Sequence, residues 1–239
     1  MSKHLGLVLL PIISAFLGCS PAPKPATPGA GGLRSWSEGS SKTAILRFVA
    51  DVTTEGSAHF VAPENRIAAF DNDGTLWTEQ PIYVMIRFAA DRMKALAPEH
   101  PEWRSKPAFV QVIDGDENAI LKLAPADQFG VGVAVHSGMT TDQYVAGATE
   151  WLATHRHPRF QRPYTDLAYA PMLELMAYLR TQGFQIYSST GAESDFVRLV
   201  NQKSFGIGPS HVLATVLKTK FSADSPPTLT ALQIGRAHV

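Results

Sequence analysis

Cysteine is almost absent from this chain of 239 residues, in which Cys19 is the only one. A single cysteine excludes the disulfide-rich scaffolds of small secreted domains. A basic surplus is lacking as well, because Lys+Arg and Asp+Glu both number 21 and the formal net charge is zero. Proteins that bind nucleic acid neutralise its phosphates with excess Lys and Arg, so the charge balance argues against a nucleic-acid partner.

Charged residues are scarce at 18%, whereas hydrophobic residues reach 45%, which is typical of a globular protein with a core. The N-terminal apolar run, residues 5–17, is shorter than the ~20 residues that a membrane-spanning helix needs. It follows a short basic start at Lys3. This arrangement matches the core of a signal peptide, which we expect over residues 1–18.

The apolar run ends in residues 16–19, FLGC, which resemble a bacterial lipobox. In that motif a small residue precedes a cysteine that is lipidated and becomes the mature N-terminus. The resemblance implies lipidation of Cys19, and Ser20 in place of an Asp after it implies an anchor on the periplasmic face of the outer membrane. A plain secretory signal with a chance cysteine is the alternative.

Residues 19–43 are rich in Pro, Ala, Gly and Ser. This composition offers little apolar surface and predicts a flexible tether between the lipid anchor and a folded domain. The folded region is therefore expected to begin near residue 44.

Short apolar runs and helical patterns alternate along the folded region. Residues 66–70 (RIAAF), 184–189 (FQIYSS) and 211–216 predict three strands, the first of which stops at a polar turn. The expected helices begin at Pro81, at the capping box of Thr140 and Gln143, and at Pro171. Strand–helix alternation at both ends, with helices between, predicts an α/β fold with a parallel sheet and a helical insertion.

Two carboxylates, Asp71 and Asp73, directly follow the first predicted strand. Both can face the open end of the sheet, where ligands bind in α/β folds. Because such close carboxylates repel each other, Mg²⁺ is their natural partner. One could attack a phosphoryl group and the other could protonate the leaving group, with Gly74 allowing the tight turn. A polar turn without chemistry is the alternative.

Residues 70–76 (FDNDGTL) resemble the first motif of the haloacid dehalogenase-like hydrolase superfamily, DxDGT after the first core strand. The resemblance implies a Rossmann-like parallel sheet core, Mg²⁺ as cofactor and a small-molecule phosphoester as substrate. It assigns Asp71 as nucleophile and metal ligand, and Asp73 as general acid/base with its backbone carbonyl on the metal. Dehalogenase members usually lack the second acid, so Asp73 favours a phosphatase over the alternative, a dehalogenase or phosphonatase.

The second motif of the superfamily is a Ser or Thr at the end of the second core strand, which binds the transferring phosphoryl group. Related sequences place this hydroxyl six residues before a Phe, and Phe196 then selects Thr190, with Ser189 as the alternative. Gly191 would open backbone N–H groups at a helix start to a phosphate oxygen. The resemblance therefore implies Thr190 as a catalytic and substrate-binding residue and Gly191 as a substrate-binding residue.

The insertion, residues 78–166, resembles the helical cap of phosphoserine phosphatase-like members, which leaves residues 44–77 and 167–232 as the core. Trp77, Glu79 and Gln80 follow the first motif and are candidates for the pocket wall, and residues 136–140 (HSGMT) are a candidate cap loop. Cap packing is the alternative role for each. Residues 155–157 (HRH) lack helical metal-ligand spacing and predict a solvated helix end.

Two further elements of the superfamily, a lysine and a later acidic pair, are not recognisable after Thr190. Asp224 is the only acid beyond Asp195, and Lys218 and Lys220 are candidates for the lysine. The resemblance covers residues 45–221, so we expect a core incomplete at its C-terminus, an inactive chain, and a non-native tail at 233–239. A non-catalytic, phosphate-binding lipoprotein is the alternative from another class.

Overall fold

The computed structural model describes residues 33–116, 118–219 and 228–229. The expected signal segment 1–18, the lipidation site Cys19, Lys220 and the tail 233–239 lie outside the described residues. In the part of the chain that is described, no helix is both long and apolar enough to cross a membrane. The predictions of export and lipid anchoring therefore rest on the sequence.

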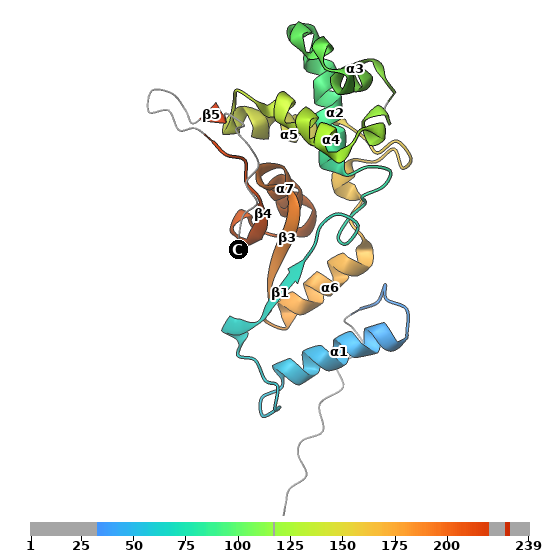
Figure 1. The fold of residues 1–239 in the computed structure, drawn as a ribbon. Helices are drawn as coiled ribbons and strands as arrows, with labels where there is room; N and C mark the ends of the chain where they lie inside the picture. Colours follow the sequence, from blue (N-terminus) through green and yellow to red (C-terminus); the bar gives the residue numbers. More distant parts are fainter. Residues whose placement is uncertain (1–32, 117, 220–227, 230–239) are drawn as a thin grey trace, which may run out of the picture.

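The described chain is an α/β structure, as the sequence predicts (Figure 1). Its strands are β1 (Ile67–Phe70), β2 (Met139–Thr140), β3 (Gln185–Glu193), β4 (Val212–Thr215) and β5 (Thr228–Leu229). Its α-helices are α1 (Ser40–Thr53), α2 (Val84–Leu96), α3 (Pro107–Asp114), α4 (Pro125–His136), α5 (Thr141–Thr154), α6 (Ala170–Thr181) and α7 (Ser194–Val200). Short 3-10 turns and one π turn, Asn201–Phe205, join them.

The main sheet has the order β1-β3-β4, with all three strands parallel. Ile67 pairs with Gln185 and Phe70 with Ser188, so β1 and β3 end side by side. The carboxyl ends of the strands face the helices α2–α5, which form a cap at one end of the molecule (Figure 1). A second, antiparallel pair joins β2 to β5. The parallel core with a helical insertion predicted from the sequence is thus confirmed.

β3 extends further than the sequence predicts. The expected strand ends at residue 189, whereas β3 continues through Thr190 and Gly191 to Glu193. A register shift against β4 between Ser189 and Glu193 accommodates the extra length. Thr190 and Gly191 therefore lie on an irregular strand end, with α7 beginning three residues after Gly191.

Helix starts were predicted with mixed success. The capping box is confirmed, because Thr140 Oγ1 accepts the Gln143 N–H at 3.1 Å and Gln143 Oε1 accepts the Thr140 N–H at 2.9 Å. The helix expected to open at Pro81 begins only at Val84. The predicted helix at Pro171 is α6, in which Pro171 occupies the first turn.

The N-terminal part of the described chain is packed, in contrast to the predicted tether over residues 19–43. The Leu33 side chain is 1% exposed, and the backbone N–H groups of Arg34 and Ser35 donate to the Glu174 carboxylate at 2.6 and 2.8 Å. α1 then begins at Ser40. The prediction was wrong for this stretch, because one leucine in a Gly/Ser-rich context gives no periodic signal.

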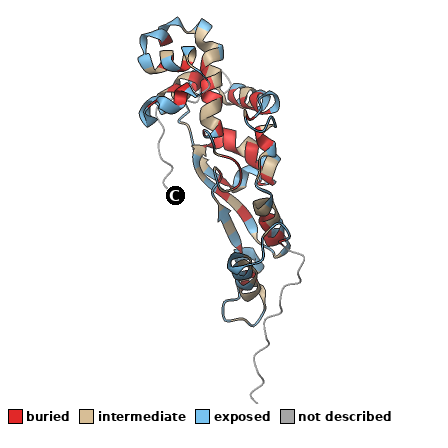
Figure 2. Cartoon of the chain, turned by 90° about the vertical axis from the view of Figure 1, so that its right-hand side faces the viewer, coloured by how far each residue is buried: buried red, intermediate tan, exposed pale blue. Residues whose placement is uncertain are grey.

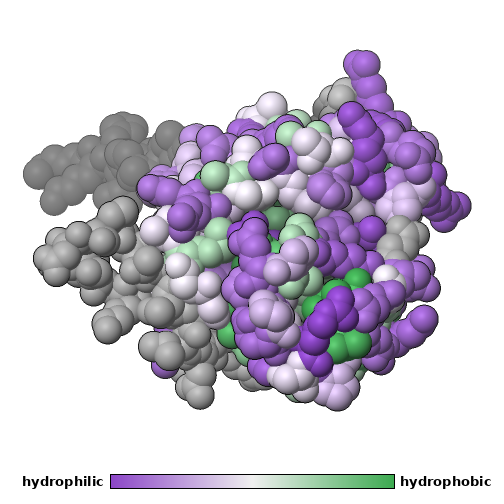
Figure 3. All heavy atoms as spheres, turned by 90° about the horizontal axis from the view of Figure 1, so that it is seen from above, coloured by the Kyte–Doolittle hydropathy of each residue, from purple (hydrophilic) through white to green (hydrophobic). Residues whose placement is uncertain are grey.

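Two hydrophobic clusters hold the molecule together. The larger one joins the sheet to α1, α5, α6 and α7, and it includes Trp77 and Phe88. The smaller one lies inside the cap, where Met93, Trp103 and Phe109 pack together. Buried residues run through the middle of the molecule and exposed residues cover its outer faces (Figure 2). The outer surface of the cap is largely hydrophilic, so its apolar helix faces are turned inward (Figure 3).

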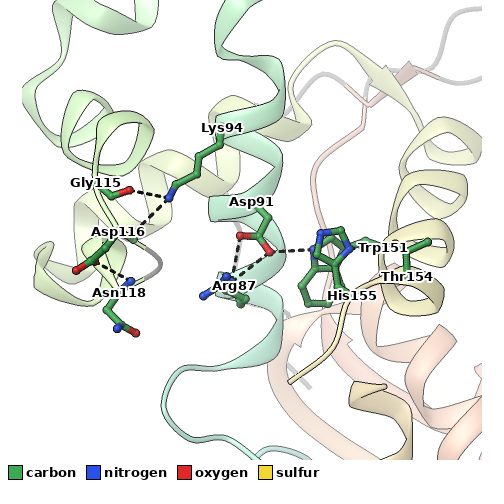
Figure 4. Close-up of polar contacts among 9 residues, drawn as sticks. All are labelled: Arg87, Asp91, Lys94, Gly115, Asp116, Asn118, Trp151, Thr154 and His155. Carbon is green, nitrogen blue, oxygen red and sulfur yellow. Dashed lines mark hydrogen bonds and ion pairs between the residues drawn. The ribbon is translucent and has the colours of Figure 1, made fainter. Parts of the chain in front are cut away.

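Polar contacts fix α2 within the cap (Figure 4). The Asp91 carboxylate accepts the indole N–H of Trp151 and the Arg87 Nε–H, both at 3.1 Å, and this joins α2 to α5. Lys94 Nζ donates to the Gly115 carbonyl at 2.8 Å and joins α2 to the end of α3. These contacts hold α2 in place above the sheet.

His157 corrects the prediction of a solvated helix end. Its ring is buried, its Nε2–H donates to the Gln80 carbonyl at 2.9 Å, and its Nδ1 accepts the Arg159 N–H at 3.1 Å. His157 therefore fixes the segment that connects the sheet to the cap.

Candidate functional site

A pocket of about 390 Å³ lies where β1 and β3 end, beneath the first turn of α2. Parallel strands bring their carboxyl ends to one edge of the sheet, which is the usual ligand position in such folds. Its lining residues are Asp71, Asp73, Glu79, Tyr83, Met85, Ile86, Thr190, Gly191 and Ala192. The structure therefore brings together all four residues to which the sequence analysis assigned phosphoryl chemistry.

The turn after β1 directs both aspartates into this pocket. The Asn72 carbonyl accepts the N–H groups of Thr75 and Leu76 at 3.1 and 2.8 Å, and the Gly74 N–H donates to the Trp77 carbonyl at 3.0 Å. Gly74 has a φ of +73°, and a Cβ at this position would lie 2.6–2.9 Å from the Glu79 carboxyl atoms. The backbone conformation therefore favours glycine, and a Cβ would in addition displace the carboxyl end of the Glu79 side chain.

Asn72 links this turn to β3. Its side chain is buried, and Oδ1 accepts a 2.6 Å hydrogen bond from the buried Ser188 Oγ–H. Ser188 lies two residues before Thr190 on the same strand. The bond therefore ties the aspartate turn to the strand that carries the predicted phosphoryl-binding residues.

Asp73 is the most strongly perturbed carboxyl group in this pocket. Burial raises its pKa to about 6, a hydrogen bond from Trp77 Nε1 at 3.0 Å opposes this shift, and the charges of Asp71 and Glu79 add to it. A carboxyl group with this pKa can give up and take back a proton near neutral pH. This behaviour suits a general acid/base.

Thr190 and Gly191 form the opposite side of the pocket. Thr190 Oγ1 accepts the Ala192 N–H at 3.2 Å, which leaves its hydroxyl proton available to a ligand oxygen. The Gly191 carbonyl accepts the Thr215 Oγ1–H at 2.8 Å, which fixes this stretch against β4. Ser189, the alternative for the hydroxyl, is exposed and does not line the pocket.

Comparisons with known proteins give similarity at the level of structure only. No protein family model matches the sequence, and no curated protein matches it. The solved structures that resemble this chain include a phosphoserine phosphohydrolase-like protein and a HAD family hydrolase.

Three of these structures illustrate the range of sequence identity, TM-score and coverage. A phosphoserine phosphohydrolase-like protein from Francisella tularensis subsp. tularensis SCHU S4 is 14% identical with a TM-score of 0.38, over 72% of this chain and 65% of that one. A protein with unknown function from Bordetella pertussis Tohama I is 15% identical with a TM-score of 0.45, over 72% of this chain and 66% of that one. A HAD family hydrolase from Salmonella enterica subsp. enterica serovar Typhi is 12% identical with a TM-score of 0.35, over 74% and 49%. This chain thus spans less than two thirds of the length of each.

The pocket offers oxygen ligands of the kind that Mg²⁺ prefers. Among the described residues, no group of three or more His, Cys, Asp or Glu side chains has a metal-binding arrangement. The Asp71 and Glu79 carboxylates nevertheless lie near enough to raise the pKa of Asp73, so a cation would be stabilised among them. Mg²⁺ commonly takes one or two protein carboxylates and completes its shell with water and substrate oxygens, and Asp71 and Asp73 fit that donor set.

Some candidates lie away from the pocket, and some lining residues were not predicted. Lys218 is exposed and does not line the pocket, and Gln80 contributes a carbonyl to His157 instead. Glu79 lines the pocket as suggested, and Trp77 supports it through Asp73. Tyr83 and Met85 were missed, because their position depends on where α2 begins and no sequence signal marks that point.

Proposed function

We propose that this protein is a Mg²⁺-dependent phosphatase of the haloacid dehalogenase-like superfamily that acts on a small phosphoester. The single observation that carries the proposal is the convergence of Asp71, Asp73, Thr190 and Gly191 on one pocket at the carboxyl end of a parallel sheet. The pKa of about 6 for Asp73 supports it, because that residue can then serve as acid and as base.

The reaction would proceed in two steps. The Asp71 carboxylate attacks phosphorus to form an aspartyl-phosphate, while Asp73 gives its proton to the departing alkoxide oxygen. Asp73, now a carboxylate, takes a proton from water, and the resulting hydroxide attacks phosphorus and releases phosphate from Asp71. The Thr190 hydroxyl and the Gly191 N–H would hold phosphoryl oxygens throughout. Mg²⁺, held by Asp71 and the Asp73 backbone carbonyl, would supply positive charge to the phosphoryl oxygens.

We infer from the sequence that the enzyme works outside the cytoplasm. The apolar segment before Cys19 and the lipobox-like FLGC support a lipid anchor on the periplasmic face of the outer membrane. Bacterial lipoproteins carry more than one acyl chain, and several chains anchor far more stably than one. Replacing Cys19 with Ala should therefore either leave the domain uncleaved at its signal or release it as soluble protein.

The proposal is tested with the full-length product of the native gene and an aryl phosphate. Hydrolysis is expected with Mg²⁺ and not after its chelation, and Asp71→Asn should abolish it because an amide cannot attack phosphorus. Asp73→Asn should slow it by ~10²–10⁴-fold, the usual contribution of general acid/base catalysis. Asp166→Asn is the matched control, because Asp166 is exposed and lies outside the pocket. Undiminished hydrolysis by Asp71→Asn would contradict the assignment.

A phosphate-binding protein without catalysis is the second candidate. Two observations favour it. Lys218 lies outside the pocket, and no group of three or more His, Cys, Asp or Glu side chains among the described residues could hold a metal ion. In that case phosphate would bind to the full chain and binding would weaken in Thr190→Val, while no phosphoester would be hydrolysed.

A further inference from the structure

A second cavity, of about 300 Å³, adjoins the aspartate pocket inside the cap. Met85 and Ile86 line both cavities, so the two share one wall at the start of α2. The rest of its lining is mainly apolar and includes Ala89 and Phe129. Its volume is at the lower end of the ~300–1,000 Å³ typical of small-molecule sites.

One buried polar atom in the wall of this cavity, His136 Nε2, has no hydrogen-bond partner. His136 is 6% exposed. Buried polar atoms are nearly always paired, since an unpaired one costs ~1–3 kcal/mol. The unpaired nitrogen therefore points to a missing polar partner.

The protonation state of His136 defines what that partner must be. Burial, and then the nearby charge of Arg92, lowers the pKa of His136 to about 3, so the ring is neutral at ordinary pH. Its other nitrogen is hydrogen-bonded to the Gly132 backbone. A carbonyl can only accept, so the proton sits on that nitrogen and Nε2 is left as an acceptor. A ligand in this cavity would therefore pair with Nε2 through a hydrogen-bond donor.

Charge in the cavity wall limits the ligand further. Glu193 lines the cavity, and its oxygens already accept the N–H groups of Asp195 and Phe196 at 2.8 and 2.9 Å. No Lys or Arg belongs to the described residues that line the cavity. An anionic group would meet the Glu193 carboxyl with no cation in contact with it, because Arg92, whose charge lowers the pKa of His136, lies outside the lining. The same charge of Arg92 opposes an ammonium group.

Gly132 is an independent sign that the space is kept for a ligand. It lies inside α4, where a glycine costs about 1 kcal/mol relative to alanine. A Cβ added to Gly132 would have no atom within 4 Å, so nothing in the described protein demands a glycine there. Gly132 also lines the cavity, and a side chain at this position would enter the open space.

We propose that this cavity seats the leaving group of the substrate, an uncharged and largely apolar organic group, of about the size of one substituted ring, that carries a hydroxyl donor. The hydroxyl donates to His136 Nε2, and the apolar body packs against Ala89, Phe129 and Gly132. This assignment rests on the proposed phosphatase function, because it places the phosphoryl group in the adjoining pocket of Asp71 and Asp73.

Binding of phosphate-free probes tests the cavity without relying on catalysis. Benzyl alcohol and ethylbenzene have nearly the same shape and differ in a hydroxyl against a methyl group. Both are expected to bind the full chain, as measured by ligand-observed NMR. In His136→Leu, benzyl alcohol should weaken by about tenfold relative to ethylbenzene, the effect of losing one hydrogen bond. His155→Leu is the matched control, because His155 is exposed and lies outside the cavity.

Filling the cavity provides a second variant that the fold should tolerate. Gly132→Leu should prevent binding of both probes, whereas Gly132→Ala, which gains the same helical propensity with little added volume, should retain most of it. Failure of both probes to bind the wild-type chain, or an unchanged preference in His136→Leu, would overturn the proposal.

Kinetics separate this proposal from the proposed function. Hydrolysis of 4-(hydroxymethyl)phenyl phosphate should show a raised KM in Gly132→Leu and in His136→Leu. If phosphoesters are hydrolysed and neither variant changes KM or probe binding, the cavity assignment is wrong and the phosphatase proposal stands. If the probes bind as expected and no phosphoester is hydrolysed, the cavity is a ligand site and the phosphatase proposal is wrong.

Discussion

Ser188 Oγ donates a 2.6 Å hydrogen bond to Asn72 Oδ1, and both side chains are buried at the junction of β1 and β3. The bond crosses from the aspartate turn to the strand that carries Thr190. It thereby helps to set the separation between the nucleophile and the hydroxyl that would hold the phosphoryl group. Asn72, which stands between the two aspartates in the motif, is thus a positioning residue.

Removing this bond should weaken the fold. Ser188→Ala leaves the buried Asn72 Oδ1 without a donor, so the free energy of unfolding should fall by about 1–3 kcal/mol in urea titrations. The control is Ser189→Ala, because Ser189 is exposed and such substitutions usually stay within about 0.5 kcal/mol. Equal effects of the two changes would show that the Ser188 bond contributes nothing.

The turn at Gly74 offers a comparison between backbone strain and side-chain contact. Gly74 and Gly56 have φ values of +73° and +84°, but only at Gly74 would a Cβ meet the Glu79 carboxyl group, at 2.6–2.9 Å. Alanine at either position should cost ~1–2 kcal/mol from the left-handed backbone. Gly74→Ala should cost more in urea unfolding, and Glu79→Ala in the same chain should remove the excess. An excess that survives the second change would mean that Glu79 is not its cause.

Stability should depend on pH through His136. Its pKa is about 3 in the folded protein and 6.5 when unperturbed, so the unfolded chain binds more protons between these values. The contribution of His136 to the free energy of unfolding is therefore fully present above pH 6.5. It decreases as the pH falls below 6.5, by at most about 1.4 kcal/mol per pH unit. Arg92 and Tyr144 lie near the ring. Glu193 lines the same cavity, and because burial raises its pKa it acts in the opposite direction.

The contribution of His136 is isolated by comparison with His136→Gln, in which those three neighbours remain. Urea unfolding at pH 7.5, 6 and 5 should show a steeper loss of stability in the wild type than in this variant. Parallel pH dependences would mean that His136 does not carry the effect.

The parts of this molecule that could be read from the sequence are those specified by local patterns. The apolar run before Asp71 and the reciprocal bonds of Thr140 and Gln143 are local, and the strand and the capping box are found where expected. The convergence of Asp71 and Thr190 followed from the rule that parallel strands end at one edge. Each of these inferences needs only neighbouring residues and one rule of topology.

The missed features depend on tertiary contacts. His157 is buried because it reaches the Gln80 carbonyl, far away in the sequence, and Leu33 is buried because Glu174 holds the segment that follows it. The second cavity requires α2, α4, α5 and β3 to meet, and no local pattern in Gly132 or His136 announces it. Such features become visible only when the chain is folded.

The packing of Leu33 leads to a prediction that separates a tether from a folded segment. Leu33 is 1% exposed in the main hydrophobic cluster, so Leu33→Ala should lower the free energy of unfolding by about 2–5 kcal/mol, as for other large-to-small core substitutions. Leu213→Ala is the control, because Leu213 is 46% exposed and should lose far less. A flexible tether would give no change at residue 33, since a mobile side chain buries no surface. Urea unfolding of the two variants and the wild type therefore decides whether the folded domain begins before α1. If Leu33→Ala loses no more free energy of unfolding than Leu213→Ala, residues 33–39 belong to the tether.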